Sequence, residues 1–541
     1  PWTGRRCRKT ADPVYERISF CHDGRELALP ALSLNPKLNI LGLSAFYHDS
    51  SCCLMQDGDL IAAASEERFT RIKHDARIPV NAFRYCLAQA NLIPTDLDCI
   101  AYYEDPIKKT GRQAAFGNFL SLKSELSRID PQHPQRMIRE NLGFDGQILS
   151  FDHHKSHAAS AYYYSGFQES AILTVDGVGE WATTTYGTGV GNSISIFESV
   201  DFPHSIGLLY ATITAFLGFR VNSGEYKVMG LAPYGKPVLV DELWSLIDLK
   251  KKGQFRLNLE YFDFLDGREM YSAKLSELLQ MQPRKAESEL TSDHKNLARS
   301  LQVLTEELLL DKVSYLKDTT GMDNLAMAGG VALNAVANRR IRRESRFHNL
   351  FIQPAAGDAG ACLGSAALAH VKLCGQRHST EMLTSVFLGP EFSNQDIIPA
   401  LNAAGIRPLD FSNSEEKLIE AVVDRLLANK IIGWFQGRME FGPRALGARS
   451  ILANPMDPEI RDRINKAVKK REAFRPFAPT ILYSHLPAHM DITHHVPFMI
   501  ETCQVTSELS LPAITHVDGS ARPQSITGDA PVSYTHLTLP T

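Results

Sequence analysis

The residues with the clearest capacity for chemistry lie in the run 152–157, with the sequence DHHKSH. His153 and His157 are four residues apart, so on a helix both imidazoles share one face, one turn apart. Asp176 follows an apolar segment, 171–175, that predicts a strand. Two imidazoles and a carboxylate suit Zn, Fe or Mn and leave a coordination position for substrate. From spacing alone, a metal site and a surface histidine cluster are equally good interpretations.

A second carboxylate stands before a helix predicted over 361–369, where Asp358 follows Gly357. Asp358 is interpreted either as the N-cap of that helix or as a further metal ligand. His154, between the two other histidines, points well away from their shared face and is not expected to be a ligand.

Three turn segments, 45–50, 176–180 and 328–334, are candidates for holding a phosphate. The last two contain glycine, which lets backbone N–H groups approach an anion closely, and the third leads into a helix N-terminus. The first lacks glycine, and its interest is His48. A plain turn remains the alternative for each, and none has the GxxxxGK[ST] pattern of a Walker A loop.

The segment 438–475 is locally basic, with ten Lys and Arg against five Asp and Glu. A solvated helix face accounts for part of this excess, particularly over 461–471. Within 437–447, however, Arg438 and Arg444 lie among Gly and Pro with few other polar residues. Arginine in that setting favours bidentate recognition of a phosphate or carboxylate.

Composition restricts the class of protein. The chain has 541 residues, 44% hydrophobic and 22% charged, with a net charge of −4, which is typical of a globular protein of two or more domains. The charge argues against bulk binding of nucleic acid, and no apolar run approaches the ~20 residues of a membrane span. Nine scattered cysteines without a zinc-type CxxC pair predict reduced thiols and a cytoplasmic location.

Strand and helix signals alternate, which predicts an α/β protein with a mixed sheet. Two similar hairpin sets, near 40–64 and 171–198, indicate an internal duplication, and Asp57-Gly58 predicts a hairpin turn. Strands are predicted over 38–43, 51–56, 60–64, 99–103, 171–175, 183–188, 193–198, 324–328 and 431–435. Helices are predicted over 79–90, 297–316, 333–342, 361–369 and 415–429.

Composition shifts over 373–396, which places a domain boundary there and predicts domains at 38–380 and 381–530. Residues 1–37 are basic and aperiodic and are interpreted as a non-native extension. Residues 531–541, PVSYTHLTLPT, are interpreted as a translated non-native tail that replaces the natural end of the second domain. If that is correct, the true C-terminus is missing.

In order along 38–530, the chain resembles the O-carbamoyltransferase family, whose members carbamoylate nodulation factors, cephem antibiotics and aminoglycosides. The segments that carry the resemblance are LGLSAFYHDSSCCL, SEERFTRIKHD, DHHKSHAASAYYYSGF, TVDGVGEWATT, GEYKVMGLAPYG, GGVALNAVANR, GDAGACLGSA and GRMEFGPRALGARSI. The resemblance implies a duplicated actin-like ATPase domain, related to the tRNA threonylcarbamoyl-transfer proteins, over 38–380. It implies a YrdC-like α+β domain over 381–530.

The resemblance also implies a two-stage reaction. ATP, with Mg, and carbamoyl phosphate give a carbamoyl-adenylate in the second domain, and the first domain transfers the carbamoyl group to a hydroxyl of a sugar-containing or natural-product acceptor. By position, the resemblance implies a catalytic base at His48 and carbamoyl-adenylate binding at Lys73, Gly330 and Asn334. It implies binding of ATP and carbamoyl phosphate at Arg438, Arg444, Lys469, Arg471 and Arg522. It also implies ligation of a divalent metal, with Fe(II) expected, at His153, His157, Asp176 and Asp358.

Two other functions remain open from the sequence. One is threonylcarbamoyl transfer to tRNA, because the HxxxH pattern and the ATPase fold are shared; the arginine-rich second domain argues against it. The other is a non-catalytic, actin-like nucleotide-binding module. Neither a nucleic-acid partner nor a membrane is expected, and the acceptor and the oligomeric state are left open.

Overall fold

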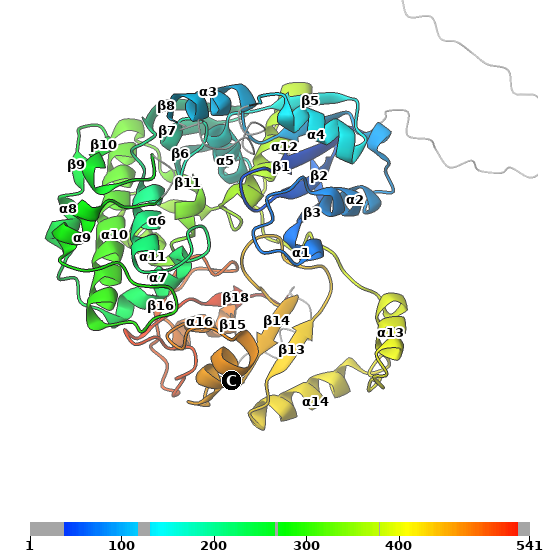
Figure 1. Cartoon of the computed structure of the whole chain (residues 1–541). Coiled ribbons are helices and arrows are strands. Elements are labelled where there is room, and N and C mark those ends of the chain that lie inside the picture. The colour runs from blue at the N-terminus through cyan, green and yellow to red at the C-terminus, as the bar shows by residue number, and fades with distance from the viewer. Residues whose placement is uncertain (1–36, 117–129, 266–268, 378, 529–541) are drawn as a thin grey trace, which may run out of the picture. The chain divides into compact units, whose positions relative to one another are not determined.

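The computed structural model of the chain describes residues 37–116, 130–265, 269–377 and 379–528. The two segments interpreted as non-native, 1–37 apart from its last residue and 531–541, therefore lie outside the described residues. Leu38–Thr541 clusters as one compact unit. Two five-stranded sheets dominate its first part (Figure 1).

The first sheet begins with a meander of three antiparallel strands, and two parallel strands follow on the other side of β1. Its order is β3 (Asp59–Ser65), β2 (Ser51–Gln56), β1 (Asn39–Ser44), β4 (Cys99–Tyr102) and β5 (Gln147–Ser150). β1 pairs antiparallel with β2 and parallel with β4. Because β1 has neighbours on both edges and helices on both faces, all six of its residues are buried.

The second sheet repeats this arrangement strand for strand. Its order is β8 (Ser193–Asp201), β7 (Ala182–Val190), β6 (Glu169–Val175), β11 (Asn324–Ala328) and β12 (Asn349–Ile352). β6 pairs antiparallel with β7 and parallel with β11, as β1 does with β2 and β4. The predicted duplication and mixed sheet are confirmed. Two such repeats form the duplicated α/β architecture expected of an actin-like domain.

One helix from each repeat fills the space between the sheets. α5 (His153–Tyr162) follows β5, and α12 (Asp358–Cys374) follows β12, so the two helices are equivalent in the duplication. α12 packs on β1, β2 and β4, α5 packs on β6, β7 and β11, and the two helices pack against each other (Figure 1). Gly364 permits that approach, because an added Cβ would lie 1.8 Å from the carbonyl oxygen of Ser156.

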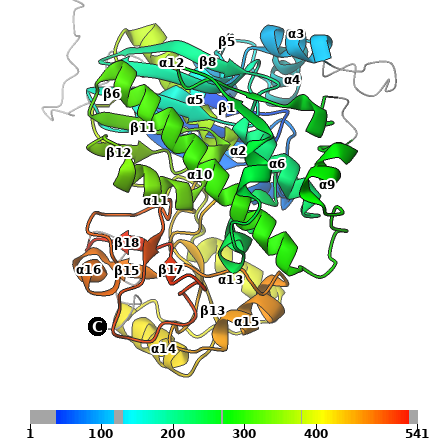
Figure 2. The same cartoon turned by 90° about the vertical axis from the view of Figure 1, so that its left-hand side faces the viewer.

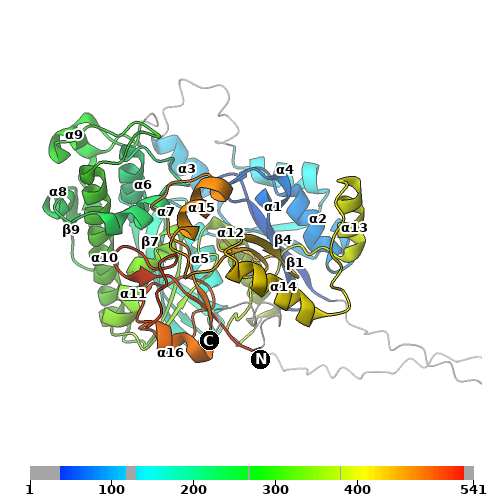
Figure 3. The same cartoon turned by 90° about the horizontal axis from the view of Figure 1, so that it is seen from below.

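Other helices cover the outer faces of the sheets. α2 (Val80–Ala88) and α4 (His133–Leu142) share a hydrophobic cluster with the first sheet (Figure 3). The long helix α10 (Ser292–Thr320), with α6 (Ile206–Phe216) and α11 (Ala335–Glu344), covers the second sheet (Figure 2). Smaller elements of this part are α1 (Glu67–Thr70), α3 (Pro106–Phe116), α7 (Glu225–Leu231), α8 (Val240–Trp244), α9 (Ala273–Leu279), β9 (Ile247–Leu249) and β10 (Phe255–Leu257).

The C-terminal part consists of short elements and three two-stranded sheets. The sheets pair β13 (Ile432–Phe435) with β14 (Arg449–Leu452), β15 (Thr480–Leu482) with β18 (Gln524–Ile526), and β16 (Cys503–Gln504) with β17 (Ser520–Ala521). The helices are α13 (Asn394–Ala403), α14 (Glu415–Leu427), α15 (Ile460–Arg463) and α16 (Leu486–His489). This part is α+β in character, and its likeness to the YrdC fold stays a prediction.

Every strand and helix predicted from the sequence coincides with an observed element, and Asp57-Gly58 forms the β2–β3 turn. The helix predicted from residue 333 begins two residues later, because the side chain of Asn334 caps it by accepting from the N–H of Ala337. The cysteines that the structure describes are all free thiols. Within the described ranges, no helix is both long and apolar enough to cross a membrane.

Candidate metal centre and active site

The two histidines of the HxxxH pattern are in the first two turns of α5 and face the interior. His153 is 1% exposed and His157 is fully buried, so the interpretation as a surface histidine cluster is wrong. α5 tolerates burial on all sides because Ala158, Ala159 and Ala161 are small enough for close packing between the two sheets.

Four side chains meet at one point between the repeats. The Nε2 atoms of His153 and His157 are 3.1 Å apart, and His153 Nε2 lies 3.1 Å from Oδ2 of Asp176. Asp358 Oδ1 lies 3.7 Å from His153 Nε2 and 3.5 Å from His157 Nε2. One ligand atom of each residue lies within 4.8 Å of the others. Two nitrogens and two carboxylates around one point suit a divalent transition metal.

The surroundings of Asp358 support a cation at this point. Asp358 is 1% exposed, and its two carboxylate oxygens accept no hydrogen bond from any described residue. It is the first residue of α12, whose N-cap is Gly357, so the interpretation of Asp358 as an N-cap is wrong. A buried carboxylate without donors is costly unless a positive charge compensates it. The four residues therefore fit a bound metal.

Protonation of the cluster follows the same electrostatics. Burial lowers the pKa of His157, but the adjacent carboxylates of Asp176 and Asp358 outweigh burial and raise the pKa to about 9. The pKa of Asp176 is held well below its usual range because both imidazoles outweigh its burial.

Asp176 is positioned by the glycine turn after β11. Its Oδ1 accepts a 2.8 Å hydrogen bond from the backbone N–H of Gly330. The preceding Gly329 has φ 93°, and a Cβ there would lie 2.3 Å from the carbonyl oxygen of Val175. Only glycine lets this turn lie directly against the end of β6. The turn that was a phosphate-cradle candidate thus borders the metal-type cluster.

His48 lies at the edge of the same cluster, in the turn after β1. Its Nδ1 is 2.9 Å from Asp49 Oδ2, and its Nε2 is 3.8 Å from Asp358 Oδ2. Burial lowers the pKa of His48, but Asp358 and Asp49 raise it to about 9. The turns that hold His48 and Asp176 are equivalent in the duplication, since each follows the central strand of its sheet.

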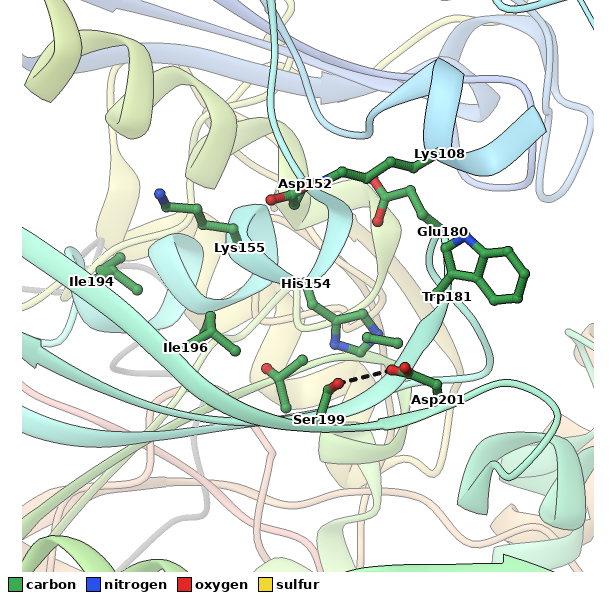
Figure 4. Close-up of a pocket in the computed structure, with 12 residues that line it drawn as sticks. Lys108, Asp152, His154, Lys155, Glu180, Trp181, Ile194, Ile196, Ser199 and Asp201 are labelled. Atoms are coloured by element: carbon green, nitrogen blue, oxygen red, sulfur yellow. Dashed lines mark hydrogen bonds and ion pairs between the residues drawn. The ribbon is translucent and has the colours of Figure 1, made fainter. Parts of the chain in front are cut away.

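A pocket of about 370 Å³ lies beside the N-terminus of α5 (Figure 4). His154 lines it and bonds through Nδ1 to Thr174 Oγ1 at 2.6 Å, as expected of a histidine outside the ligand set. Lys108 pairs with Asp152 at its rim, with Trp181 close by. Glu180, also at its wall, accepts from the backbone N–H of His153 at 2.8 Å and so fixes the start of α5.

Lys73 and Asn334, the other side chains implied for adenylate binding, have different hydrogen-bond partners. Lys73 Nζ donates to Ser223 Oγ at 2.9 Å and to Tyr226 OH at 3.1 Å. Asn334 is buried, caps α11 and bonds to Gln302. Its amide is therefore engaged in holding α10 against α11, whereas the amine of Lys73 lies at a partly exposed surface.

Four arginines of the C-terminal part lie close to one another, and Arg444, Arg471 and Arg475 also lie near Tyr226. Burial and the charges of Arg444, Arg475 and Arg471 hold the pKa of Arg522 well below its usual range. Burial, with Arg475 nearby, lowers the pKa of Arg444 to about 10. The Nε atoms of Arg444 and Arg522 are buried without a hydrogen-bond partner in the part of the chain that the structure describes. A cluster of like charges with unsatisfied donors is suited to a polyanion.

The arginine cluster, defined as Arg444, Arg471, Arg475 and Arg522, contacts the first part of the chain. The guanidinium of Arg475 stacks on Tyr226, 4.7 Å from the ring centroid, and the hydroxyl of Tyr226 also accepts a hydrogen bond from Lys73. A second pocket, of about 430 Å³, is lined in part by Arg471, Lys466 and Lys470. Lys469 is exposed at the edge of this region.

Arg438 does not join the arginine cluster. Its guanidinium donates to the carbonyl oxygens of Leu388 at 2.6 Å and Ile61 at 2.9 Å, and to Tyr85 OH at 3.1 Å. These bonds tie the loop to the first sheet, and all three are made by Nη2, one of the two terminal nitrogens of the guanidinium. The phosphate role expected of Arg438 stays a prediction, and its bonds to backbone carbonyls are ones that the sequence pattern does not reveal.

Three residues of the site were not singled out from the sequence. Asp49, beside His48, bridges two imidazoles; Tyr226 joins Lys73 to the arginine cluster; and Arg475 was only one of the ten basic residues of 438–475. Asp49 and Tyr226 do stand inside the quoted segments LGLSAFYHDSSCCL and GEYKVMGLAPYG. The signal was present, but spacing alone does not tell which polar residue of a segment faces the site.

Comparison with known proteins decides the family. Residues 39–367 match the family model described as "Carbamoyltransferase N-terminus", and 423–539 match "Carbamoyltransferase C-terminus". The chain belongs to the carbamoyltransferase family. It is thus an enzyme of the transferase class, and the resemblance drawn from its sequence is confirmed.

Two curated relatives match over most of the chain, and a third matches over part of it. It is 40% identical to the uncharacterized protein sll1178 of Synechocystis, over 92% of this chain and 88% of that protein. It is 35% identical to the nodulation protein NolNO of Sinorhizobium fredii, over 91% of this chain and 71% of that protein. The 3'-hydroxymethylcephem-O-carbamoyltransferase of Streptomyces clavuligerus is 36% identical over 38% of this chain and 37% of that enzyme.

Proposed function

We propose that the protein is an ATP-dependent O-carbamoyltransferase. It forms carbamoyl-adenylate from ATP and carbamoyl phosphate, and transfers the carbamoyl group to a hydroxyl of a sugar-containing or natural-product acceptor. The observation that carries the proposal is the presence of two distinct charged sites: a buried His/Asp cluster between the repeated sheets and a cluster of four arginines, in which Arg475 pairs with Glu472 at 3.7 Å. The name of the cephem relative, an O-carbamoyltransferase, supports a hydroxyl acceptor.

The arginine cluster is suited to the first stage. ATP and carbamoyl phosphate are both polyanions, and a partly buried set of guanidinium groups binds phosphoryl oxygens with two donors each. We assign Arg444, Arg471 and Arg522 to this anion site, with Arg475 as an addition and Lys469 at its edge. ATP is expected to enter with Mg²⁺, which offsets part of its charge.

The His/Asp cluster is suited to the second stage. His153, His157, Asp176 and Asp358 would hold a divalent ion, which we propose to be Fe(II). A bound cation there would polarise the carbamoyl carbonyl as a Lewis acid. Gly330 and its glycine turn, with Lys73, are proposed to bind the adenylate.

His48 is proposed as the base of the transfer step. An alcohol is a weak nucleophile, and a positioned base that takes its proton contributes typically 10²–10⁴-fold to the rate. His48 Nε2 faces Asp358 at the edge of the cluster, where the acceptor hydroxyl would lie. Nε2 takes the hydroxyl proton while the oxygen attacks the carbamoyl carbon, and AMP leaves with the electrons of the broken C–O bond.

Each stage is proposed to belong to one domain, with transfer over 38–380 and adenylate formation in a YrdC-like domain over 381–530. The decisive assay measures pyrophosphate released from ATP with and without carbamoyl phosphate, followed by mass spectrometry of carbamoylated product. The acceptor probes are 3-hydroxymethylcephem and an aminoglycoside.

The expected result is pyrophosphate release that depends on carbamoyl phosphate. The product is expected to be heavier than the probe by ~43 Da, the mass that a carbamoyl group adds when it replaces a hydrogen. Carbamoyl transfer to tRNA in the same assay would favour the threonylcarbamoyl-type function. ATP binding with neither pyrophosphate release nor transfer would favour a non-catalytic nucleotide module and refute the proposal.

A further inference from the structure

The turn that carries His48 is fixed by a segment about 25 residues further along the chain. The backbone N–H of Phe46 donates to the carbonyl oxygen of Ala76 at 2.8 Å, and the backbone N–H of Ser50 donates to the carbonyl oxygen of Asp75 at 2.9 Å. Two motifs that are separate in sequence, AFYHDS and RIKHD, therefore form one structural unit beside the His/Asp cluster.

Asp49 is the centre of this unit. Its Oδ2 lies 2.9 Å from His48 Nδ1, and its Oδ1 lies 2.7 Å from His74 Nδ1. His74 is held in turn by its backbone N–H, which donates to Glu67 Oε2 at 3.0 Å. The Asp49 carboxylate thus bonds to the Nδ1 atoms of two imidazoles, one on each oxygen, and its orientation is fixed from both sides.

The backbone of the unit is strained. Phe46, Asp49 and His74 all have positive φ, at 74°, 54° and 57°. Non-glycine residues with positive φ each cost of order 1–3 kcal/mol and persist where the surrounding structure fixes them, often at functional sites. Three such residues around one carboxylate indicate that the geometry of this unit is maintained at the expense of local stability.

The bridge has a direct chemical consequence for His48. An ionised carboxylate only accepts hydrogen bonds, so the Nδ1 atom that faces Asp49 must carry a proton. In neutral His48, the lone pair is then on Nε2, the atom that faces Asp358 and the cluster. Without Asp49, no hydrogen bond at Nδ1 would hold the proton there, and the lone pair would not be kept on Nε2, directed at the reacting hydroxyl.

We propose that Asp49 is a positioning residue for carbamoyl transfer, which holds His48 with Nε2 directed at the acceptor hydroxyl, and that His74 fixes Asp49 in that role. The inference rests on the proposed function for the identity of the reaction. Asp49 itself touches no reacting atom, so its removal slows transfer without changing the arginine cluster, where the intermediate is made.

The test compares Asp49→Ala and Asp49→Asn with the wild-type protein. Asp323→Ala is a matched control, because Asp323 Oδ1 also lies near a histidine, 3.7 Å from His348 Nδ1, far along the chain from the site. Three quantities are measured: pyrophosphate release, the kcat and KM of transfer to the two hydroxyl probes, and the melting temperature. Imidazole ¹⁵N–¹H NMR follows the His48 Nδ1–H signal, assigned by its loss in His48→Gln.

Asp49→Ala is expected to lower the kcat of transfer about 100-fold, within the range for loss of a positioned base, while KM and pyrophosphate release stay unchanged. The hydrogen-bonded Nδ1–H signal disappears in this variant. Asp49→Asn retains an acceptor oxygen and is expected to recover part of the kcat, and Asp323→Ala matches the wild type.

Wild-type transfer rates in Asp49→Ala would overturn the inference, as would a persistent Nδ1–H signal. A parallel fall in pyrophosphate release, transfer and melting temperature would also overturn it, since that pattern belongs to a merely structural residue. If the wild type carbamoylates neither probe, the proposed function fails on its own, and the dependence of the Nδ1–H signal on Asp49 then decides the inference.

Discussion

The substitution Asp358→Asn tests the metal centre, because its expected effect on stability differs between the metal-free and the metal-bound protein. It keeps the size of the side chain but removes one of two negative charges from a buried cluster. In the metal-free protein, the Asp358 oxygens accept no hydrogen bond from the described residues, so their charge is poorly compensated. The metal-free variant is therefore expected to be as stable as the wild type or more stable, whereas its response to metal is lost.

The magnitude follows from linkage. Metal at 100 times its Kd stabilises the wild type by about 2.7 kcal/mol. A 100-fold weakening, at the upper end of what loss of an outer-shell partner causes, leaves about 0.4 kcal/mol in the variant at the same concentration. For the compact unit Leu38–Thr541, of about 500 residues and with an unfolding entropy of about 1.06 kcal/mol/K, these values correspond to shifts of about 2.5 °C and about 0.4 °C.

The assay is thermal unfolding of chelator-treated protein, titrated anaerobically with Fe²⁺ and separately with Mn²⁺ and Zn²⁺. His154→Gln is the matched control, because His154 lies on the same buried helix but bonds to Thr174 instead of facing the cluster. This control is expected to be less stable without metal and to keep the full metal-induced shift. An equal metal-induced shift in Asp358→Asn and wild type, or no shift in wild type with any of the three metals, would show that the cluster is not a metal site.

Three further predictions concern the arginine cluster, the helix packing and an ion pair. Arg444→Ala is expected to raise the KM for ATP or carbamoyl phosphate about tenfold, because it removes about 1.5 kcal/mol of binding free energy. Arg438→Ala is expected to lower the melting temperature and to leave KM unchanged. Pyrophosphate-release kinetics distinguish the two variants. Gly364→Ala should push α5 and α12 apart, destabilise the protein by about 1–3 kcal/mol and weaken metal binding, as measured by denaturant unfolding and metal titration. Burial raises the pKa of Glu501, but His494 and Arg342 outweigh burial and hold that pKa below its usual range. The ion pairs of ionised Glu501 therefore stabilise the fold fully above the ordinary glutamate pKa of about 4.3, and this stabilisation is lost as pH falls further. Glu501→Gln should therefore be less stable than wild type at pH 7, and the difference should shrink below pH ~4 in urea unfolding.

Local order along the chain was predictable because it depends on neighbouring residues. Apolar runs bounded by turn residues located β1, β2, β6 and β11 within two residues of their observed bounds, since such strands are buried on both faces. The short strands β5 and β12 were missed: Gln147–Ser150 and Asn349–Ile352 mix polar and apolar residues, and only their pairing with β4 and β11 makes them strands.

The sequence by itself determined which residues could form a metal-type cluster, since the four-residue spacing of His153 and His157 places them on one helix face. Tertiary structure decided that Asp176 and Asp358, 182 residues apart in number, meet them at one point. The physical reason is the duplication: equivalent helices α5 and α12 pack in contact between equivalent sheets, so their N-termini converge. The same packing bonded Arg438 to Leu388 and Ile61 and joined Asp49 to His74, and hydrogen bonds between distant segments leave no periodic trace in the sequence.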